Sequence, residues 1–215
     1  MTEKFSDNTE PLLSEISRYY ANKLAEHGST PCGVDWNGEE GQILRFEQLC
    51  KIINKGSHFS LNDLGCGYAA LLDFISTKYS SFKYIGIDIS PEMIQSAKKR
   101  IPISSNTDFL TAYQPNTICD YGIASGIFNV RLNKEDAEWE QYLISTLDIL
   151  SETSNLGFSF NCLTSYSDEY KKRKYLYYAD PAWIFNLCKN RYSRNVALLH
   201  DYDLYEFTIL VRKSA

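Results

Sequence analysis

The sequence predicts an α/β domain, and three observations support that fold class. Residues 60–75 have the pattern of a buried strand, a tight glycine turn and a helix. Residues 82–87 form a second apolar run, which ends at Asp88 and is followed by a second helix start. From Leu61 onward, strand-like and helix-like segments alternate, as they do in a parallel sheet covered by helices.

Composition narrows the classes of protein that the chain can belong to. With 215 residues, 44% of them hydrophobic, it can bury one sizeable core. The net charge of −5 argues against duplex nucleic acid as a partner. Six cysteines without a C-x-x-C pair suggest neither a metal site nor a disulfide framework, so we expect reduced thiols in the cytoplasm. The N-terminus lacks a signal-peptide core, and no apolar run approaches the roughly 18 residues of a membrane span.

Two helices are predicted before the first strand. Apolar residues recur with helical spacing over 10–27, and Gly28 ends that helix. The loop over 28–38 contains Trp36, a large residue that we expect to fill a cavity.

The second helix, over 38–55, has an apolar arc that is interrupted by Gln42 and Arg45. A guanidinium on a buried face needs an anionic partner. Two interpretations stay open for Arg45. It can lie at the edge of the arc or pair with a structural carboxylate, or it can meet an anionic group of a bound ligand.

The glycine turn after the first strand has the features of a cofactor site. Gly65 and Gly67 allow backbone N–H groups to approach a ligand, and the following helix start adds partial positive charge. Asp63 lies two residues before the turn, where it can hold a cationic amino group. Asp88 ends the second strand, where a carboxylate can accept both hydroxyls of a ribose. A nucleotide-like cofactor is therefore expected.

The next helix begins with Ser90 as N-cap and Pro91 at its first position. Together, the segments DLGCGYA and GIDISPEMIQSAKKR resemble the glycine and ribose motifs of the class I S-adenosylmethionine-dependent methyltransferases. The resemblance covers roughly residues 61–212. Ala69 stands where the family usually has a third glycine.

The resemblance implies a Rossmann-like sheet of seven strands in the order 3-2-1-4-5-7-6, with the last strand antiparallel. It also implies a helical extension, residues 1–57, lying as a lid over a cofactor-binding domain, residues 58–215. The implied reaction is methyl transfer from S-adenosylmethionine to oxygen or nitrogen of a small-molecule acceptor, with S-adenosylhomocysteine as product. The implied cofactor-binding residues are Asp63, Gly65, Gly67, Asp88, Ile89, Ser125 and Arg45, the last through the methionine carboxylate.

The remaining elements follow from the sequence pattern. A weakly marked strand is expected around 106–110, and Asp108 there is either an adenine contact or a surface residue. Later strands are predicted over 118–124, 156–160, 194–199 and 205–212, and helices over 135–150 and 180–189. Asp168 is expected to cap a helix, and the basic, tyrosine-rich segment 168–178 is either a solvated helix face or a site for an acidic acceptor.

Ligands of such folds bind outside the carboxyl ends of the strands. On that ground Asn161, Tyr166 and Asp168 are placed to meet an acceptor, although for Asp168 the role of helix cap is preferred. Trp36 and Phe128 are further candidate acceptor contacts. His200, at the carboxyl edge of the sixth strand, is the first candidate for a general base, and Tyr166 is the second. A structural histidine, with catalysis by positioning alone, is the alternative.

Two other functions compete with methyl transfer. A nicotinamide-dependent oxidoreductase shares the glycine turn, but Asp63 and the helix start at Ser90 argue against it. A module that binds the cofactor as a sensor, without turnover, would have the same cofactor motifs. The sequence does not specify an oligomeric state.

Overall fold

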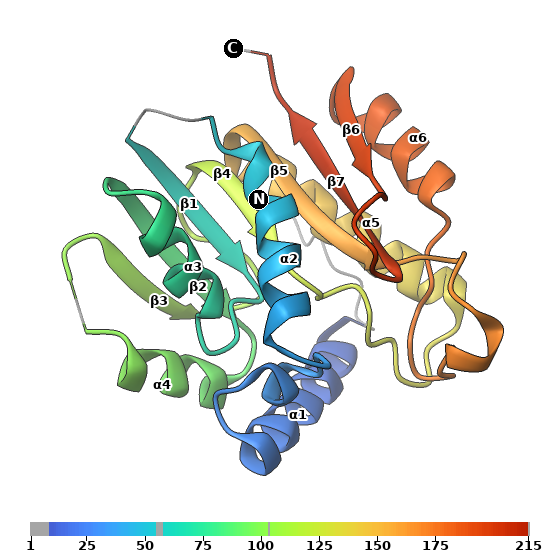
Figure 1. The fold of residues 1–215 in the computed structure, drawn as a ribbon, viewed down its shortest axis with the longest axis horizontal. Coiled ribbons are helices and arrows are strands. Elements are labelled where there is room, and N and C mark those ends of the chain that lie inside the picture. The colour runs from blue at the N-terminus through green and yellow to red at the C-terminus, as the bar shows by residue number, and fades with distance from the viewer. Residues whose placement is uncertain (1–8, 55–57, 103, 215) are drawn as a thin grey trace.

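A seven-stranded sheet forms the centre of the structure, a computed structural model in which residues 9–54, 58–102 and 104–214 are described (Figure 1). Its strand order is β3-β2-β1-β4-β5-β7-β6, which confirms the predicted topology. Only β7 runs antiparallel to its neighbours, β5 and β6. The strands are β1 (Phe59–Leu64), β2 (Phe82–Asp88), β3 (Thr107–Thr111), β4 (Cys119–Ala124), β5 (Ser154–Leu163), β6 (Asn195–Leu199) and β7 (Glu206–Arg212).

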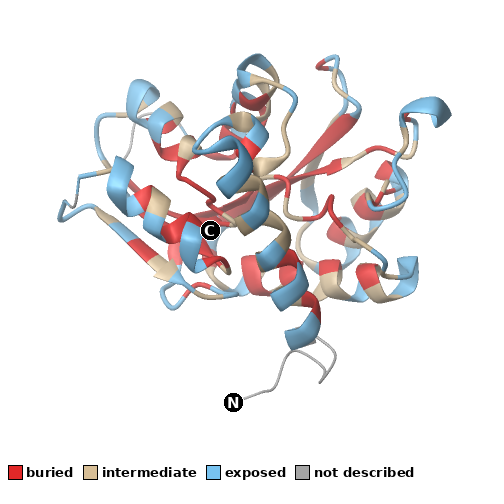
Figure 2. Cartoon of the chain, turned by 90° about the horizontal axis from the view of Figure 1, so that it is seen from below, coloured by how far each residue is buried: buried red, intermediate tan, exposed pale blue. Residues whose placement is uncertain are grey.

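Helices cover both faces of this sheet. One core cluster contains residues of α2, α3 and α4, and the other contains residues of α5 and α6. Figure 2 shows the buried residues along the sheet and on the inner sides of the helices. The helices are α1 (Thr9–His27), α2 (Glu39–Leu49), α3 (Ala70–Lys78), α4 (Pro91–Arg100), α5 (Asp136–Glu152) and α6 (Pro181–Arg191), with 3-10 turns η1 (Pro31–Val34), η2 (Cys50–Ile52) and η3 (Glu169–Lys171). None of the described helices is both long and apolar enough to span a membrane.

Local capping explains where two of these helices begin. The Ser90 hydroxyl accepts the Met93 N–H at 3.3 Å, and Pro91 is the first residue of α4, as predicted. Asp180 accepts the N–H groups of Ala182 and Trp183 at the start of α6. In contrast, the Asp168 side chain makes no capping hydrogen bond to η3, because its carboxylate accepts the Tyr205 hydroxyl at 2.5 Å.

The N-terminal region differs from the expected lid of 57 residues. Helix α2 packs onto the sheet, with Leu49 fully buried and its carbonyl accepting the Ser159 hydroxyl at 2.9 Å. It is therefore part of the layer that covers one face of the sheet. The part of the N-terminal region that lies across the carboxyl edge of the strands consists of α1 and η1 (Figure 1). The predicted boundary at residue 57 falls in 55–57, outside the described residues.

Candidate active site

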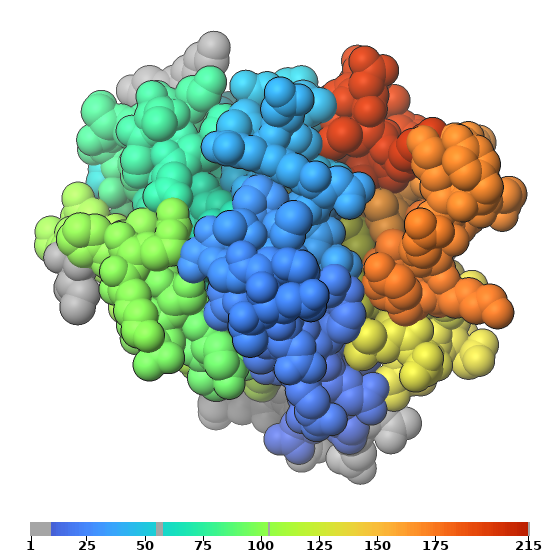
Figure 3. All heavy atoms as spheres, turned by 60° about the horizontal axis from the view of Figure 1, so that its bottom comes forward, coloured from blue at the N-terminus to red at the C-terminus, as the bar shows by residue number. Residues whose placement is uncertain are grey.

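A cavity lies at the carboxyl ends of β1, β2 and β4, under α1 and η1. It encloses about 980 Å³ of empty space, a volume that includes the solvent at its open mouth. Figure 3 shows α1 (blue) over this edge, with a hollow between the blue N-terminal helices and the segment around residues 165–180 (orange). The lining includes Asp63, Gly65, Gly67, Asp88, Ile89, Ser125 and Trp36, which the sequence had singled out. The structure therefore brings these residues together, while their contact with a cofactor stays a prediction.

The glycine turn adopts a conformation that few other residues could adopt. Gly65 and Gly67 have φ of 78° and 54°, in the left-handed region that glycine tolerates. A Cβ added at Gly65 would lie 2.1 Å from Cγ2 of Ile127. The Gly65 and Cys66 N–H groups both donate to the Ile87 carbonyl, at 2.7 and 3.0 Å. The turn is thus fixed to the end of β2, beside Asp88.

Asp88 joins the turn to the start of α4. Its Oδ2 accepts the Gly67 N–H at 2.9 Å, and its Oδ1 accepts the Ser90 N–H at 2.8 Å. Burial raises the pKa of this carboxyl to about 6, although the N–H groups of Ser90, Gly67 and Ile89 oppose that rise. Since an ionised carboxylate has about four acceptor sites, capacity remains for a ligand hydroxyl beside these N–H groups.

Asp63 is the second buried carboxyl of the cavity, and it is only 1% exposed. The Tyr84 hydroxyl donates to its Oδ2 at 2.6 Å. Burial raises the pKa of Asp63 to about 7. The Tyr84 hydrogen bond opposes that rise, and the negative charge of Asp88 adds to it. A cationic group placed here would favour the ionised form.

The wall at the end of β4 has polar groups of its own. The Ser125 hydroxyl is buried and has no hydrogen-bond partner among the described residues, which is uncommon in a protein interior. Next to it, Gly126 has φ of 77°, and a Cβ added there would lie 2.4 Å from Cζ2 of Trp36. The indole therefore packs directly on the Gly126 backbone.

Helix α1 covers the cavity on the side away from the strand ends. Leu13, Ile16 and Tyr20 line it from this helix. Asp35 connects the helix to the loop after η1, because it accepts the Tyr19 hydroxyl at 2.7 Å and pairs with Lys23 at 2.9 Å.

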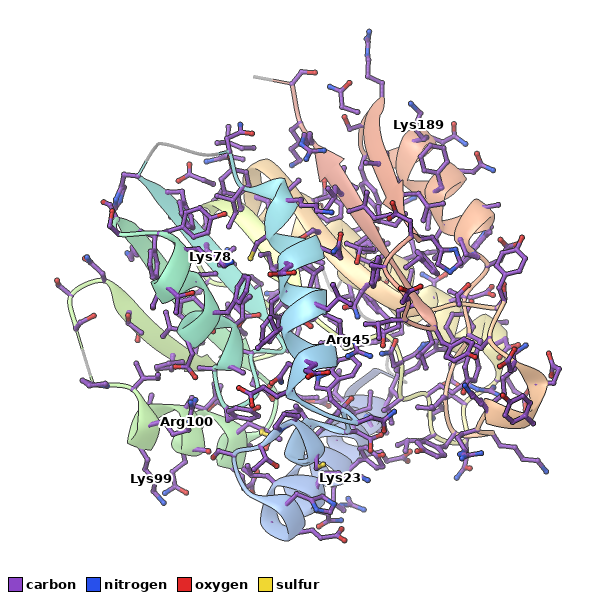
Figure 4. All side chains as sticks on the ribbon, viewed as in Figure 1. Lys23, Arg45, Lys78, Lys99, Arg100 and Lys189 are labelled. Carbon is purple, nitrogen blue, oxygen red and sulfur yellow. The ribbon has the colours of Figure 1, made fainter. Side chains whose placement is uncertain are left out.

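Arg45 does have an anionic partner, as its position in the apolar arc required, but that partner is a protein carboxylate. Its Nε and Nη2 donate to the two carboxylate oxygens of Glu206 at 2.8 and 2.7 Å. Figure 4 shows Arg45 on the side of α2 that faces β7. Arg45 does not line the cavity, so the structure supports the structural ion pair of the two interpretations and not the methionine carboxylate.

Two predicted acceptor contacts are also placed differently. Asn161 is fully buried, with its side-chain amide bonded to Gly126 and Glu206. Phe128 is fully buried too, because its ring packs edge-on against Phe160 in the core, 5.5 Å between centroids. Neither side chain has a surface on which an acceptor could rest.

The two candidate bases lie side by side but outside the cavity lining. The rings of His200 and Tyr166 are 6.0 Å apart, and Tyr166 is 75% exposed. Asp108 is exposed, and its carboxylate accepts the Phe109 N–H, so it is a surface residue of β3. Sequence reasoning missed Glu206. The available signal was that Arg45 needed a buried carboxylate and that Glu206 is the one acid in the predicted strand 205–212.

The chain is similar to known methyltransferases in sequence and in fold. A family model described as a methyltransferase domain matches residues 62–130. A protein of Mycobacterium tuberculosis (strain ATCC 25618 / H37Rv), named "Putative methyltransferase Rv1506c", is 56% identical over 165 residues, which are 77% of this chain and 99% of that protein.

Two solved structures share the fold across nearly the whole chain. The first is magnesium protoporphyrin IX methyltransferase from Synechocystis PCC 6803 with bound SAM, with a TM-score of 0.62, 12% identity, and coverage of 99% of this chain and 100% of that one. The second is N-methyltransferase NodS from Bradyrhizobium japonicum WM9 in complex with S-adenosyl-L-homocysteine, with a TM-score of 0.64, 14% identity, and coverage of 93% and 98%. At these identities the likeness is one of fold.

Proposed function

We propose, because this chain belongs to the class I S-adenosylmethionine-dependent methyltransferases, that it transfers a methyl group from S-adenosylmethionine to oxygen or nitrogen of a small-molecule acceptor. The observation that carries the proposal is the pair of buried carboxyls, Asp63 and Asp88, on either side of the glycine turn in one cavity. A nucleoside cofactor with a cationic amino group has complementary groups for both.

The order of the strands determines which end of the cofactor would lie beside which strand. In the parallel register, Asp63 of β1 pairs with Gly86 of β2 on one side and with Ile123 of β4 on the other. Asp88 would hold the ribose on the β2 side, and Asp63 would hold the amino group. Ser125, just beyond β4, would face the amino-acid end with a hydroxyl that has no partner in the described part of the chain. The residues present therefore fit this cofactor.

The cofactor, when bound, supplies a methyl group on a positively charged sulfur. The protein's contribution is then largely to hold two reactants in line, which can supply several kcal/mol. Apolar residues of α1 cover the cavity and limit access of water. If a base removes the acceptor's proton, His200 is our first candidate and Tyr166 the second. Both lie at the carboxyl edge, beyond the β5 side of the cavity.

A small acceptor is supported by the net charge of −5 and by the hollow between α1 and the segment around residues 165–180 (Figure 3). The six cysteines are free, which supports a reducing, cytoplasmic location.

Calorimetry and a turnover assay test the proposal together. We expect S-adenosylhomocysteine, and not NADH, to bind with one-site stoichiometry. Incubation with methyl-labelled S-adenosylmethionine and a small-metabolite pool should release S-adenosylhomocysteine. Binding without release would favour the sensor module, and binding of NADH alone would favour the oxidoreductase. For variants of the cavity carboxyls, Asp120→Asn is a suitable control. The Asp120 carboxylate accepts two hydrogen bonds from Ser60 and lies outside the cavity.

A further inference from the structure

Glu206 is the centre of a buried network that lies behind the cavity wall. It is 1% exposed and begins β7. Its carboxylate accepts two hydrogen bonds from Arg45 and one, at 2.5 Å, from the side-chain amide of Asn161. Glu206 does not itself line the cavity. Its effect on a bound ligand must therefore pass through Arg45 or Asn161.

The Arg45 arm ends on an aromatic ring of the cavity. The guanidinium carbon lies 3.8 Å from the centroid of the Trp36 ring, a distance typical of a cation–π contact. Trp36 lines the cavity and packs on Gly126. Because Glu206 holds the guanidinium of Arg45 at two of its three nitrogens, Nε and Nη2, the plane of that group is fixed against the indole.

The Asn161 arm ends on the same backbone. The Oδ1 of Asn161 accepts the Gly126 N–H at 2.8 Å, while its Nδ2 donates to Glu206. These two bonds fix the amide's orientation, since the oxygen must face Gly126. Both arms therefore converge on Gly126, which follows Ser125 in the wall at the β4 side of the cavity.

We propose that Glu206 is a positioning residue for methyl transfer, which holds the Trp36 indole and the Ser125 and Gly126 wall at the amino-acid end of the cofactor. This inference rests on the proposed function for the identity of the cofactor. A buried ion pair is weak evidence for a stabilising role, because apolar residues of similar volume often replace one without loss. Here both partners carry a second contact that an apolar residue cannot make.

Three variants separate positioning from plain structural support. Glu206→Gln removes the charge that fixes Arg45. The double variant Arg45→Met and Glu206→Leu removes both charges, so it should recover stability but not the contacts of Arg45 with Trp36 and of Glu206 with Asn161. The matched control is Asp148→Asn, since Asp148 pairs with Arg191 through two bonds of 2.6 Å away from the cavity.

The first readout needs no ligand. Acrylamide quenching of Trp36 fluorescence, taken as the difference from a Trp36→Phe version of each variant, reports how firmly the indole is held. We expect the quenching constant to rise about twofold or more in Glu206→Gln and in the double variant, and to stay unchanged in Asp148→Asn. Unchanged quenching in both Glu206 variants would overturn the proposal even if the enzyme assignment is correct.

The second readout is the dissociation constant of S-adenosylhomocysteine by calorimetry. We expect it to rise about fivefold or more in both Glu206 variants, and to stay within about twofold of wild type in Asp148→Asn. A double variant that binds like wild type would show that the pair is only structural. Absence of binding to the wild-type protein would instead refute the proposed function, and the quenching result would still stand.

Discussion

Replacing Asp63 by asparagine should change stability and cofactor binding in opposite directions. In the cofactor-free protein, burial raises the pKa of Asp63 from 3.8 to about 7. At pH 8 the folded protein therefore contains a buried charge that the unfolded chain exposes to water. Asparagine removes that charge and can still accept the Tyr84 hydroxyl, which donates to Asp63 at 2.6 Å.

The sign and size of the stability effect follow from linkage. Because the folded-state pKa of Asp63 is raised, the contribution of this carboxyl to the free energy of unfolding is fully present below about pH 4. That contribution is lost as the pH rises through about 7. A rise of about three units corresponds to on the order of 4 kcal/mol, an upper value because the carboxamide is also buried. Even a quarter of it would raise the melting temperature by about 2–4 °C at pH 8. The difference between the variant and wild type should disappear at pH 4.

Binding should move the other way. Loss of one charge-assisted hydrogen bond, about 1.5–3 kcal/mol, should weaken S-adenosylhomocysteine binding roughly ten- to hundredfold. Thermal melts at pH 4 and pH 8 and calorimetry at pH 8 measure both effects, with Asp120→Asn as the control for a carboxylate outside the cavity. A variant that is less stable than wild type at pH 8, or that binds as tightly, would refute this reasoning.

Three further predictions concern the pH profile, the glycine turn and the candidate base. Cofactor affinity in wild type should be constant above about pH 8, fall about tenfold per pH unit between pH 7 and 6, and fall more steeply below pH 6, since the pKa of Asp63 is about 7 and that of Asp88 about 6. Calorimetry from pH 5.5 to 8.5 should find a flat profile if neither carboxyl contacts the ligand. Gly65→Ala should lower the melting temperature more than Gly67→Ala, because the left-handed backbone costs each about 1–2 kcal/mol but the new Cβ meets Ile127 at 2.1 Å in the first and Val34 at 3.1 Å in the second. Equal losses would contradict the packing argument. His200→Gln should lower turnover at least about a hundredfold with unchanged S-adenosylhomocysteine binding, and unchanged turnover would leave positioning as the whole of catalysis.

Much of the fold could be predicted because local patterns decide it. The second strand was expected over 82–87 and is Phe82–Asp88, and Ser90 caps α4 as the sequence indicated. Segment 168–178 is different. It forms only the short turn η3, because Leu176 within it pairs with the distant Val130, and a second bridge joins the residues that flank the segment, Thr164 and Ala179. Such pairings leave no local signal in a sequence.

For the candidate site, too, residues next to a local sequence signal could be predicted and residues placed by long-range packing could not. Asp63 and Asp88 could be identified because each lies at a fixed short distance from a turn or strand end. Phe128 could not be placed, since the sequence of a loop after a strand does not show which way each side chain points. In the structure the Phe128 ring is buried in the core. Glu206 is the one acid of a predicted strand, but it could not be assigned to Arg45, because the two residues are 161 positions apart in the chain. The sequence required an anion there, but only the folded chain shows which one.

We propose that the cavity beside the glycine turn binds S-adenosylmethionine through Asp88. The most direct test is calorimetric titration of S-adenosylhomocysteine into wild type and Asp88→Ala at the same pH. We expect saturable one-site binding to wild type and at least about tenfold weaker binding to the variant, because the charge-assisted hydrogen bonding of the ribose to Asp88 is lost. An equal dissociation constant for the two proteins, or no binding to wild type, would contradict the claim.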